Sequence, residues 1–422
     1  FGKDGDQNII ACGKYTGKSE GADGPWVDLG WQPQWILIKR SNGSAAWQLF
    51  DTMRGIVTGG NDMILNPDNN NAEITTQNRL RLEPFGFRLD ENDGDTSTDG
   101  GEYVYMAIRG EDALVSKPAE VGTEVFAMDV GNSSATIPAF DSGFPVDFGL
   151  TKNPTSGGDW YTVARLLGGN HLVNSGTNTI SNSNWTKWDS NVGEGISWSS
   201  AYQSWMWKRG AGFDTVTYRG NETAGRAIQH SLGRVPEMIW LKSRSDSYDW
   251  PVYSKFLNGG VTPEQWAVKL NYDTQEQQKD WFNNQAPTAT EFYIDNSATA
   301  NKTTSEFIAM LFASVKGISQ CGTYDGSASE ITITFDDGGF SPRYVLIKRI
   351  SGGSGDWITL DTTRGWGTTG PVNDCTLAMN TNTAQYCSTY DWGSPTATGM
   401  RLGGGSGYTN DAGSKYIYYA HA

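Results

Sequence analysis

The feature that most constrains the fold of this 422-residue chain is a spacing that recurs four times along it. In each recurrence a lysine lies nine residues after a glycine, at the end of a short apolar run. The glycine–lysine pairs are Gly30 and Lys39, Gly143 and Lys152, Gly233 and Lys242, and Gly339 and Lys348. A fixed period of this kind indicates tandem copies of one structural unit, and it outranks local motifs when a fold is predicted.

Other residues keep the same offsets and set the bounds of the copies. Aromatic anchors follow each glycine by 17 residues, or by 18 in the last copy: Trp47, Trp160, Trp250 and Trp357. A second set precedes each glycine by 15 residues: Tyr15, Met128, Tyr218 and Tyr324. Each copy ends in an aromatic-rich segment, which places four modules at 1–110, 111–212, 213–317 and 318–422. Each module is large enough to bury a core of its own.

Short apolar runs bounded by glycine, asparagine, aspartate and proline predict an all-β fold. The runs 35–39 and 344–348 are expected to be strands buried on both faces, whereas 330–335 alternates like a strand with one wet face. A short helix is expected to begin at Pro263. Strands at this spacing in units of about 100 residues favour four related β-sandwich modules, jelly-roll-like, over barrels.

Modules 1 and 4 share the motif D-T-x-R-G, as Asp51 to Gly55 and as Asp361 to Gly365. One interpretation makes Asp51 with Arg54, and Asp361 with Arg364, a binding pair. The other is structural, with the arginine fork and the carboxylate tying a strand end or turn. Modules 2 and 3 lack the motif, which favours the structural role.

An acidic loop at 90–99 contains four residues that offer oxygen ligands, Asp90, Asn92, Asp93 and Asp95. These residues are a candidate calcium site, but the glycine is out of register with an EF-hand and no glutamate ends the loop. A solvated turn is the alternative. No other metal site and no cofactor are expected.

Module 2 concentrates tryptophans among asparagine- and serine-rich loops. Flat rings beside amide and hydroxyl groups are typical of a sugar-binding surface. Trp185, Trp188 and Asn184 are therefore the candidate ligand-binding residues, with glycan or partner contact weighed against packing that anchors the loop. Trp205 and Trp207 share strand parity, so one sheet face is expected to bury both.

The four cysteines are too few for a disulfide scaffold in a chain of this length. Cys12 and Cys321 occupy the same module position, so each is expected to pack inside its own module. Cys375 and Cys387 are close enough in sequence to pair across a hairpin, and the sequence leaves their pairing open.

Signatures of catalysis are sparse. The chain has three histidines, no H-E-x-x-H or C-x-x-C motif, and one G-x-S-x-G at 17–21 that lacks the strand and helix of a nucleophile elbow. Carboxylates are plentiful, but nothing selects two that face each other as in a glycosidase. The sequence predicts a protein that is not an enzyme.

The net charge of the chain restricts the kinds of partner it can bind. Lys and Arg total 32 against 47 Asp and Glu, a net charge of −15, which disfavours binding to nucleic acid and to anionic membranes. The longest apolar run, 307–313, is too short to insert into a membrane. The start at Phe1 lacks an initiator methionine, as expected for a segment of a longer or processed polypeptide.

The motifs together resemble a known repeat. They are G-x-Y-x-G, G-[FW]-x-P-x-x-[VI]-L-I-K-R, D-T-x-R-G and the tract Y-Q-S-W-M-W-K-R-G at 202–210. This combination resembles a module of virion structural and tail-fibre proteins of tailed bacteriophages, especially marine cyanophages. The resemblance covers nearly all of the chain, with modules 1 and 4 matching best, and it carries over no catalytic or binding residues.

The resemblance implies a virion protein, assembled in the host cytoplasm and then part of an extracellular particle. The leading hypothesis is a non-enzymatic tail or head fibre that presents β-sandwich modules to host-surface glycans. Its expected partners are further copies of itself, as a homo-oligomer, and other virion proteins. A decoration or lattice-forming capsid or tail subunit is the alternative, and a polysaccharide-degrading enzyme comes last.

Overall fold

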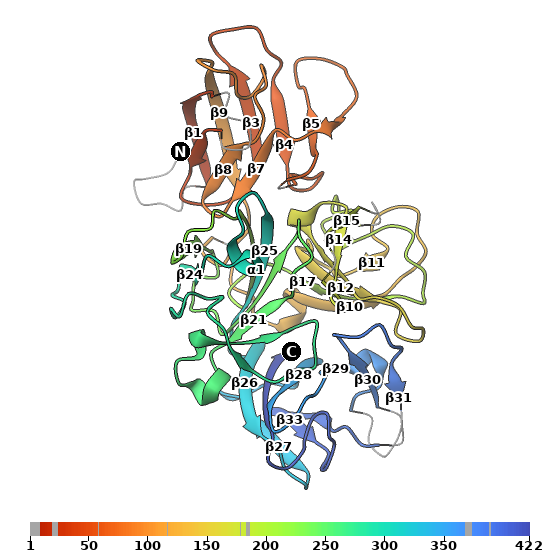
Figure 1. The fold of residues 1–422 in the computed structure, drawn as a ribbon. Helices are drawn as coiled ribbons and strands as arrows, with labels where there is room; N and C mark the ends of the chain where they lie inside the picture. Colours follow the sequence, from red (N-terminus) through yellow and green to blue (C-terminus); the bar gives the residue numbers. More distant parts are fainter. Residues whose placement is uncertain are drawn as a thin grey trace.

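A computed structural model describes residues 9–18, 24–57, 59–115, 117–177, 179–182, 186–367, 374–387 and 390–422. The predicted all-β tandem array of sandwich modules is confirmed, because four six-stranded antiparallel sheets follow one another along the chain. Each is accompanied by a second sheet of two or three strands. Figure 1 shows module 1 projecting from a cluster formed by modules 2, 3 and 4.

All four large sheets have the same strand order. In module 1 the order is β1-β9-β3-β4-β5-β6, so the first and last strands of the module pair with each other. The strands of this module are β1 Ile10–Thr16, β2 Trp26–Asp28, β3 Pro33–Arg40, β4 Gln48–Asp51, β5 Asp62–Leu65, β6 Ile74–Gln77, β7 Leu80–Glu83, β8 Gly86–Leu89 and β9 Glu102–Arg109. Strands β2, β8 and β7 form the small sheet that closes the sandwich.

Modules 2 and 3 repeat this plan with two-stranded small sheets, β11 with β16 and β19 with β24. The strands of module 2 are β10 Phe126–Val130, β11 Phe140–Asp141, β12 Phe148–Lys152, β13 Tyr161–Ala164, β14 Asn170–Val173, β15 Ser181–Asn182, β16 Gly193–Glu194 and β17 Gln203–Trp207. The strands of module 3 are β18 Phe213–Arg219, β19 Arg226–Gln229, β20 Met238–Ser243, β21 Pro251–Ser254, β22 Trp266–Lys269, β23 Gln277–Gln278, β24 Glu291–Ile294 and β25 Glu306–Phe312.

Module 4 returns to a three-stranded small sheet, β27-β33-β32. Its strands are β26 Ser319–Asp325, β27 Ile331–Thr334, β28 Tyr344–Ser351, β29 Trp357–Asp361, β30 Cys375–Ala378, β31 Tyr386–Cys387, β32 Ser394–Thr396, β33 Gly399–Leu402 and β34 Lys415–His421. The described helices are all short: α1 Ala298–Asn301 and the 3₁₀ segments η2 Gly122–Glu124, η3 Arg165–Leu167, η4 Leu257–Gly260, η5 Pro263–Gln265 and η6 Thr362–Arg364. The helix expected at Pro263 is thus one 3₁₀ turn, and Trp266 already begins a strand. None of the described helices could cross a membrane.

The anchor glycines share one backbone conformation. Gly30, Gly143, Gly233 and Gly339 have φ angles of 73°, 78°, 69° and 64°. This left-handed region suits glycine because a side chain would be strained there. The turn that leads each chain segment into the central strand therefore explains why the spacing begins at a glycine.

The tyrosine anchors form ring pairs inside three of the sandwiches. Tyr15 stacks on Tyr103, Tyr218 on Phe307 and Tyr324 on Tyr416, with centroids 5.2, 5.1 and 5.0 Å apart. Module 2 departs from this pattern. Met128 lies opposite Trp205, in the register position that Cys12 and Cys321 hold in their modules. Cys12 and Cys321 lie three residues before the tyrosine anchors, and an odd number of residues along a strand changes the sheet face. Met128 therefore lies on the opposite face from the tyrosines, and the prediction that it is their counterpart was wrong.

The large sheet of each module has an outer face, the one turned away from the small sheet, and its burial divides the modules into two groups. Modules 2, 3 and 4 bury their outer faces in one shared apolar core. Its members include Trp160 and Trp207 of module 2, Trp240 and Trp250 of module 3, and Tyr344 and Trp357 of module 4. Module 1 keeps a separate core between its two sheets, and Leu166 of module 2 packs against it. The chain is therefore a block of three fused modules with a fourth attached to it (Figure 1).

The two runs predicted to be buried on both faces differ accordingly. In β28 every residue from Tyr344 to Lys348 is buried, as predicted. Within 35–39 of β3 only Ile36 and Ile38 are buried, so the prediction is wrong for this run. The alternation predicted for 330–335 is present in β27.

Candidate functional site

The repeated lysine holds the hairpin that follows the central strand of each module. The Lys348 Nζ donates to the Gly355 carbonyl at 2.6 Å, and the Lys242 Nζ donates to the Tyr248 carbonyl at 2.8 Å. The corresponding acceptors are the carbonyls of Ala45 for Lys39 and Gly158 for Lys152. The lysine repeat thus has a structural explanation in a hairpin contact.

Modules 2, 3 and 4 join through one contact that occurs three times. In each case a backbone N–H next to the sixth strand donates to the carbonyl two residues beyond the repeated lysine of the next module. The three bonds are Ile180 to Arg244 at 2.9 Å, Glu276 to Ile350 at 3.0 Å and Gln385 to Pro154 at 2.6 Å. The direction runs from module 2 to 3, from 3 to 4 and from 4 back to 2. We call this closed arrangement the three-module ring.

Tryptophan anchors also form hydrogen bonds across these module–module contacts. The Trp160 Nε1 of module 2 donates to the Ala378 carbonyl of module 4 at 2.9 Å. The Trp357 Nε1 of module 4 donates to the Lys269 carbonyl of module 3 at 2.8 Å. Both indoles, and that of Trp250, are fully buried. These residues were predicted as repeat anchors, and the structure places them between modules.

The ring encloses three of the four repeated lysines. Lys152, Lys242 and Lys348 are fully buried, and two of them also reach a carbonyl of the neighbouring module. Burial lowers the pKa of Lys152 and Lys242 to about 8 and that of Lys348 to about 7. Taking an ammonium out of water favours its neutral form, which explains the direction.

The same positions are open in module 1. Trp47 is 36 % exposed, whereas its three counterparts are 0 % exposed. Val104 pairs with Lys39 as Ile417 pairs with Lys348, yet Val104 is 42 % exposed and Ile417 is 0 % exposed. Module 1 therefore presents to solvent the sheet face that its relatives bury in the ring.

The Asp–Arg pairs of modules 1 and 4 tie the turn at the end of the fourth strand. The Arg54 Nε donates to the Asp51 carboxylate at 2.7 Å, and the Arg364 Nε donates to the Asp361 carboxylate at 2.6 Å. In both, the aspartate also accepts the backbone N–H of its arginine. This is the structural role favoured by the sequence. In module 4 the Trp205 Nε1 of module 2 adds a bond to Asp361 at 3.1 Å.

The candidate ligand residues of module 2 have different outcomes. Trp185 and Asn184 lie outside the described residues. Trp188 is 3 % exposed, its indole N–H donates to the Gly168 carbonyl at 2.7 Å, and Arg165 lies over its ring. A buried ring offers no face to a sugar, so the glycan-binding hypothesis is withdrawn for Trp188. Its role is the alternative one, packing that anchors the loop.

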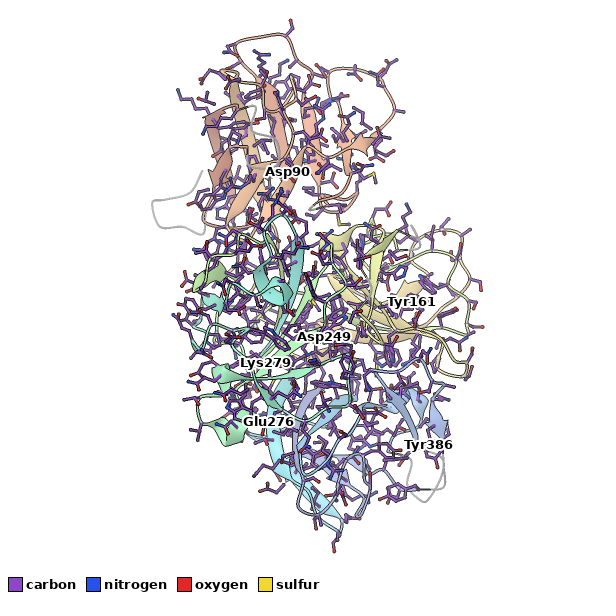
Figure 2. The ribbon with its side chains drawn as sticks, viewed as in Figure 1. Asp90, Tyr161, Asp249, Glu276, Lys279 and Tyr386 are labelled. Atoms are coloured by element: carbon purple, nitrogen blue, oxygen red, sulfur yellow. A yellow bond between two sulfur atoms is a disulfide. The ribbon has the colours of Figure 1, made fainter. Side chains whose placement is uncertain are left out.

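The carboxylates of the acidic loop form ion pairs with arginine side chains. Asp90 pairs with Arg81, and Arg79 pairs with Asp93 and Asp95, while Asn92 is exposed. A guanidinium beside these oxygens repels a cation, which removes the calcium interpretation. Asp90 is also buried, so the loop is not simply a solvated turn. Figure 2 labels Asp90 at the base of module 1, beside module 3. No group of three or more metal-ligating side chains occurs in the described ranges.

The cysteines follow the division between modules. Cys321 is buried in the three-module core, whereas Cys12 is exposed on module 1. The prediction that each packs inside its own module is therefore wrong. Cys375 and Cys387 form a disulfide between β30 and β31, which resolves the pairing that the sequence left open.

A cavity of about 560 Å³ lies where the 111–125 connector meets modules 2, 3 and 4. Its basic groups bind acceptors of the chain itself. Lys208 pairs with Glu111, Arg209 pairs with Asp214, and Arg234 donates to the Ser314 carbonyl. These three basic groups of the described lining are therefore already engaged within the chain. Much of the G-x-S-x-G motif lies outside the described residues.

The fold and its contacts define a tandem β-sandwich protein in which three modules close into a ring and the fourth leaves the matching face open. The chain belongs to the family described as Domain of unknown function (DUF7483), whose model matches residues 9–111 and 159–422. No curated protein matches the chain.

Proposed function

We propose that this chain is a non-enzymatic structural protein of a tailed-phage virion, a tail or head fibre component that presents β-sandwich modules at the particle surface. The observation that carries the proposal is the three-module ring. Buried tryptophans, three equivalent backbone hydrogen bonds and an apolar core fuse modules 2, 3 and 4 into one block. Such a block suits a part of an assembly that must resist mechanical force.

Sequence resemblance supplies the virion location in this proposal. The motifs that carry the resemblance are the ones that build the modules: the glycine turn, the lysine hairpin and the Asp–Arg turn. They are architectural and indicate no chemistry of their own. Host-surface attachment through glycans remains part of the proposal, with Trp185 as its one remaining candidate aromatic residue.

A decoration or lattice-forming subunit is the second candidate function. The open sheet face of module 1 favours it, because an exposed apolar surface of this kind marks an interaction site. In that role the chain clamps neighbouring subunits and binds no receptor.

Imaging of particles that carry this chain tests the proposal. The chain is tagged at its C-terminus, labelled with gold and located by cryo-electron microscopy. Label at the tips or along the length of projecting fibres supports the fibre function. Label in a regular array on the shell or tube supports the decoration subunit, and particles without label contradict both. Glycan-array binding that is lost in Trp185→Ala, with unchanged thermal stability, supports the attachment role.

A further inference from the structure

Module 1 contains both halves of the contact that builds the three-module ring. One half is the hairpin after the central strand, which carries the repeated lysine and tryptophan. The other half is the edge formed by the fifth and sixth strands. In the ring, the N–H donors Ile180, Glu276 and Gln385 each lie eight residues after a buried Leu or Val of the fifth strand. Glu73 lies eight residues after Leu65 and holds this position in module 1.

Both halves are exposed in the single chain. Ser41, whose carbonyl corresponds to those of Arg244, Ile350 and Pro154, lies in an exposed hairpin, and Glu73 is exposed at the opposite edge. Leu65, at 36 % exposure, matches fully buried residues of modules 2 and 4. The face between the two halves is apolar. Its members are Trp35, Leu37, Trp47, Leu49, Leu65, Val104, Met106 and Ile108.

The geometry of the ring determines what fits this face. Each ring module offers its hairpin to one neighbour and its strand edge to the other, so the contact is head-to-tail, and three modules close it. A head-to-tail contact that closes generates a cyclic assembly. Module 1 has the same strand order as the ring modules, and Leu37 lies opposite Met106 as Leu346 lies opposite Tyr419.

We propose that three copies of this chain assemble around a threefold axis through the outer faces of their module 1 sheets, which reproduce between chains the ring that modules 2, 3 and 4 form within one chain. The proposal goes beyond the proposed function and does not depend on it. Each Glu73 N–H then donates to the Ser41 carbonyl of the next copy. The Trp47 indole reaches the Asn66 carbonyl of the preceding copy, the counterpart of Ala378 and Lys269.

The mass of the full chain in solution tests the stoichiometry. We expect analytical ultracentrifugation to give three times the chain mass for the wild-type protein and a single chain mass for Val104→Arg. Arginine at this exposed position places a charge in the middle of the proposed interface without disturbing the core of module 1. Val261→Arg is the matched control, because Val261 is an exposed valine of module 3 that lies off the face, at 65 % exposure. It should stay trimeric.

The reactivity of Cys12 gives a second measurement of the same interface, independent of the mass. Its counterpart Cys321 is buried between modules, so Cys12 should react slowly with a maleimide in the wild-type trimer and at least tenfold faster in Val104→Arg. Circular dichroism and thermal melting check that the variant is folded. A wild-type monomer at every concentration overturns the proposal, as does a mass that is not a multiple of three chains. A trimer that survives Val104→Arg with Cys12 equally reactive also overturns it, because a different surface then holds the copies together.

Discussion

Module 1 and module 4 share an apolar central strand, the D-T-x-R-G turn and a cysteine at the same position, yet their outer sheet faces differ. In module 4 the face is buried between neighbours, and Cys321, Trp357 and Ile417 are inaccessible. In module 1 the corresponding Cys12, Trp47 and Val104 are exposed. Nearly the same local sequence thus supports two environments, and the presence of neighbours decides which one a module has.

The two modules are also attached by different chemistry. Module 4 meets modules 2 and 3 through aromatic packing, including Phe312 against Tyr419 at 4.9 Å. At the base of module 1 the buried Arg81–Asp90 pair lies near Glu306 and Arg219 of module 3. Buried ion pairs are weak evidence for stability, whereas buried aromatic area stabilises strongly. Module 1 is thus joined to the block differently from the way the block is joined internally.

The largest contrast is expected from the tryptophan anchors. Trp357→Ala should lower the free energy of unfolding by about 3–5 kcal/mol, because it empties a buried indole site between modules. Trp47→Ala should cost about 0.5 kcal/mol when module 1 is not covered, since its ring is partly in water. Urea titration of both variants in the Val104→Arg background measures the difference. Equal losses would show that the ring adds little to the stability of the block.

The Asp–Arg turns should give the next largest contrast. Asp361→Ala leaves Arg364 buried without its carboxylate and removes the acceptor of the Trp205 indole, so we expect a loss of about 3–5 kcal/mol. Asp51→Ala should cost about 1 kcal/mol, because the side chains of Asp51 and Arg54 are partly exposed. Thermal and urea unfolding report both values. A larger loss for Asp51 than for Asp361 would contradict the comparison.

The smallest expected effect is a change in how steeply the free energy of unfolding rises with pH. The pKa of Lys348 is about 7 in the folded chain, against 10.5 in an ordinary environment. Between these values the unfolded chain holds more protons, so this lysine makes the folded state more stable as pH rises, by about 1 kcal/mol per pH unit. Lys348→Met should flatten the rise in unfolding free energy between pH 7.5 and pH 9.

Lys242→Met serves as the companion variant, because burial lowers the pKa of Lys242 to about 8. It should flatten the same profile from a starting point about one pH unit higher. Profiles of both variants that run parallel to that of the wild type would mean that the buried lysines do not titrate as their environment indicates.

Much of each module could be predicted from the sequence. The spacing of glycine, lysine and tryptophan is periodic because each module uses the same turn, hairpin and strand pairing, and these are local consequences of residue type. The positive φ of Gly30 and its three counterparts and the Asp–Arg turn are of this kind. Alternation in 330–335 likewise follows from the pleat of a strand.

Other features could not be read locally. The register of β10 could not be predicted from the spacing. Met128 lies 15 residues before its glycine, as the tyrosine anchors do, but in the sheet it has the pairing position of Cys12 and Cys321. The environment of Trp188 could not be predicted either, since an aromatic residue in a polar loop has the same sequence pattern whether it is buried or exposed. Its contact with Gly168 depends on how the loop folds back onto the sandwich.

The sequence by itself determined the number of modules and their sandwich class, because hydrophobic periodicity and turn chemistry act within a module. Only the tertiary structure decided which outer faces are buried. The strands 35–39 and 344–348 are almost equally apolar, but burial is a property of the surroundings, and two neighbouring modules surround the second strand and not the first. The ring, the buried lysines with their lowered pKa values and the open face of module 1 all follow from that difference.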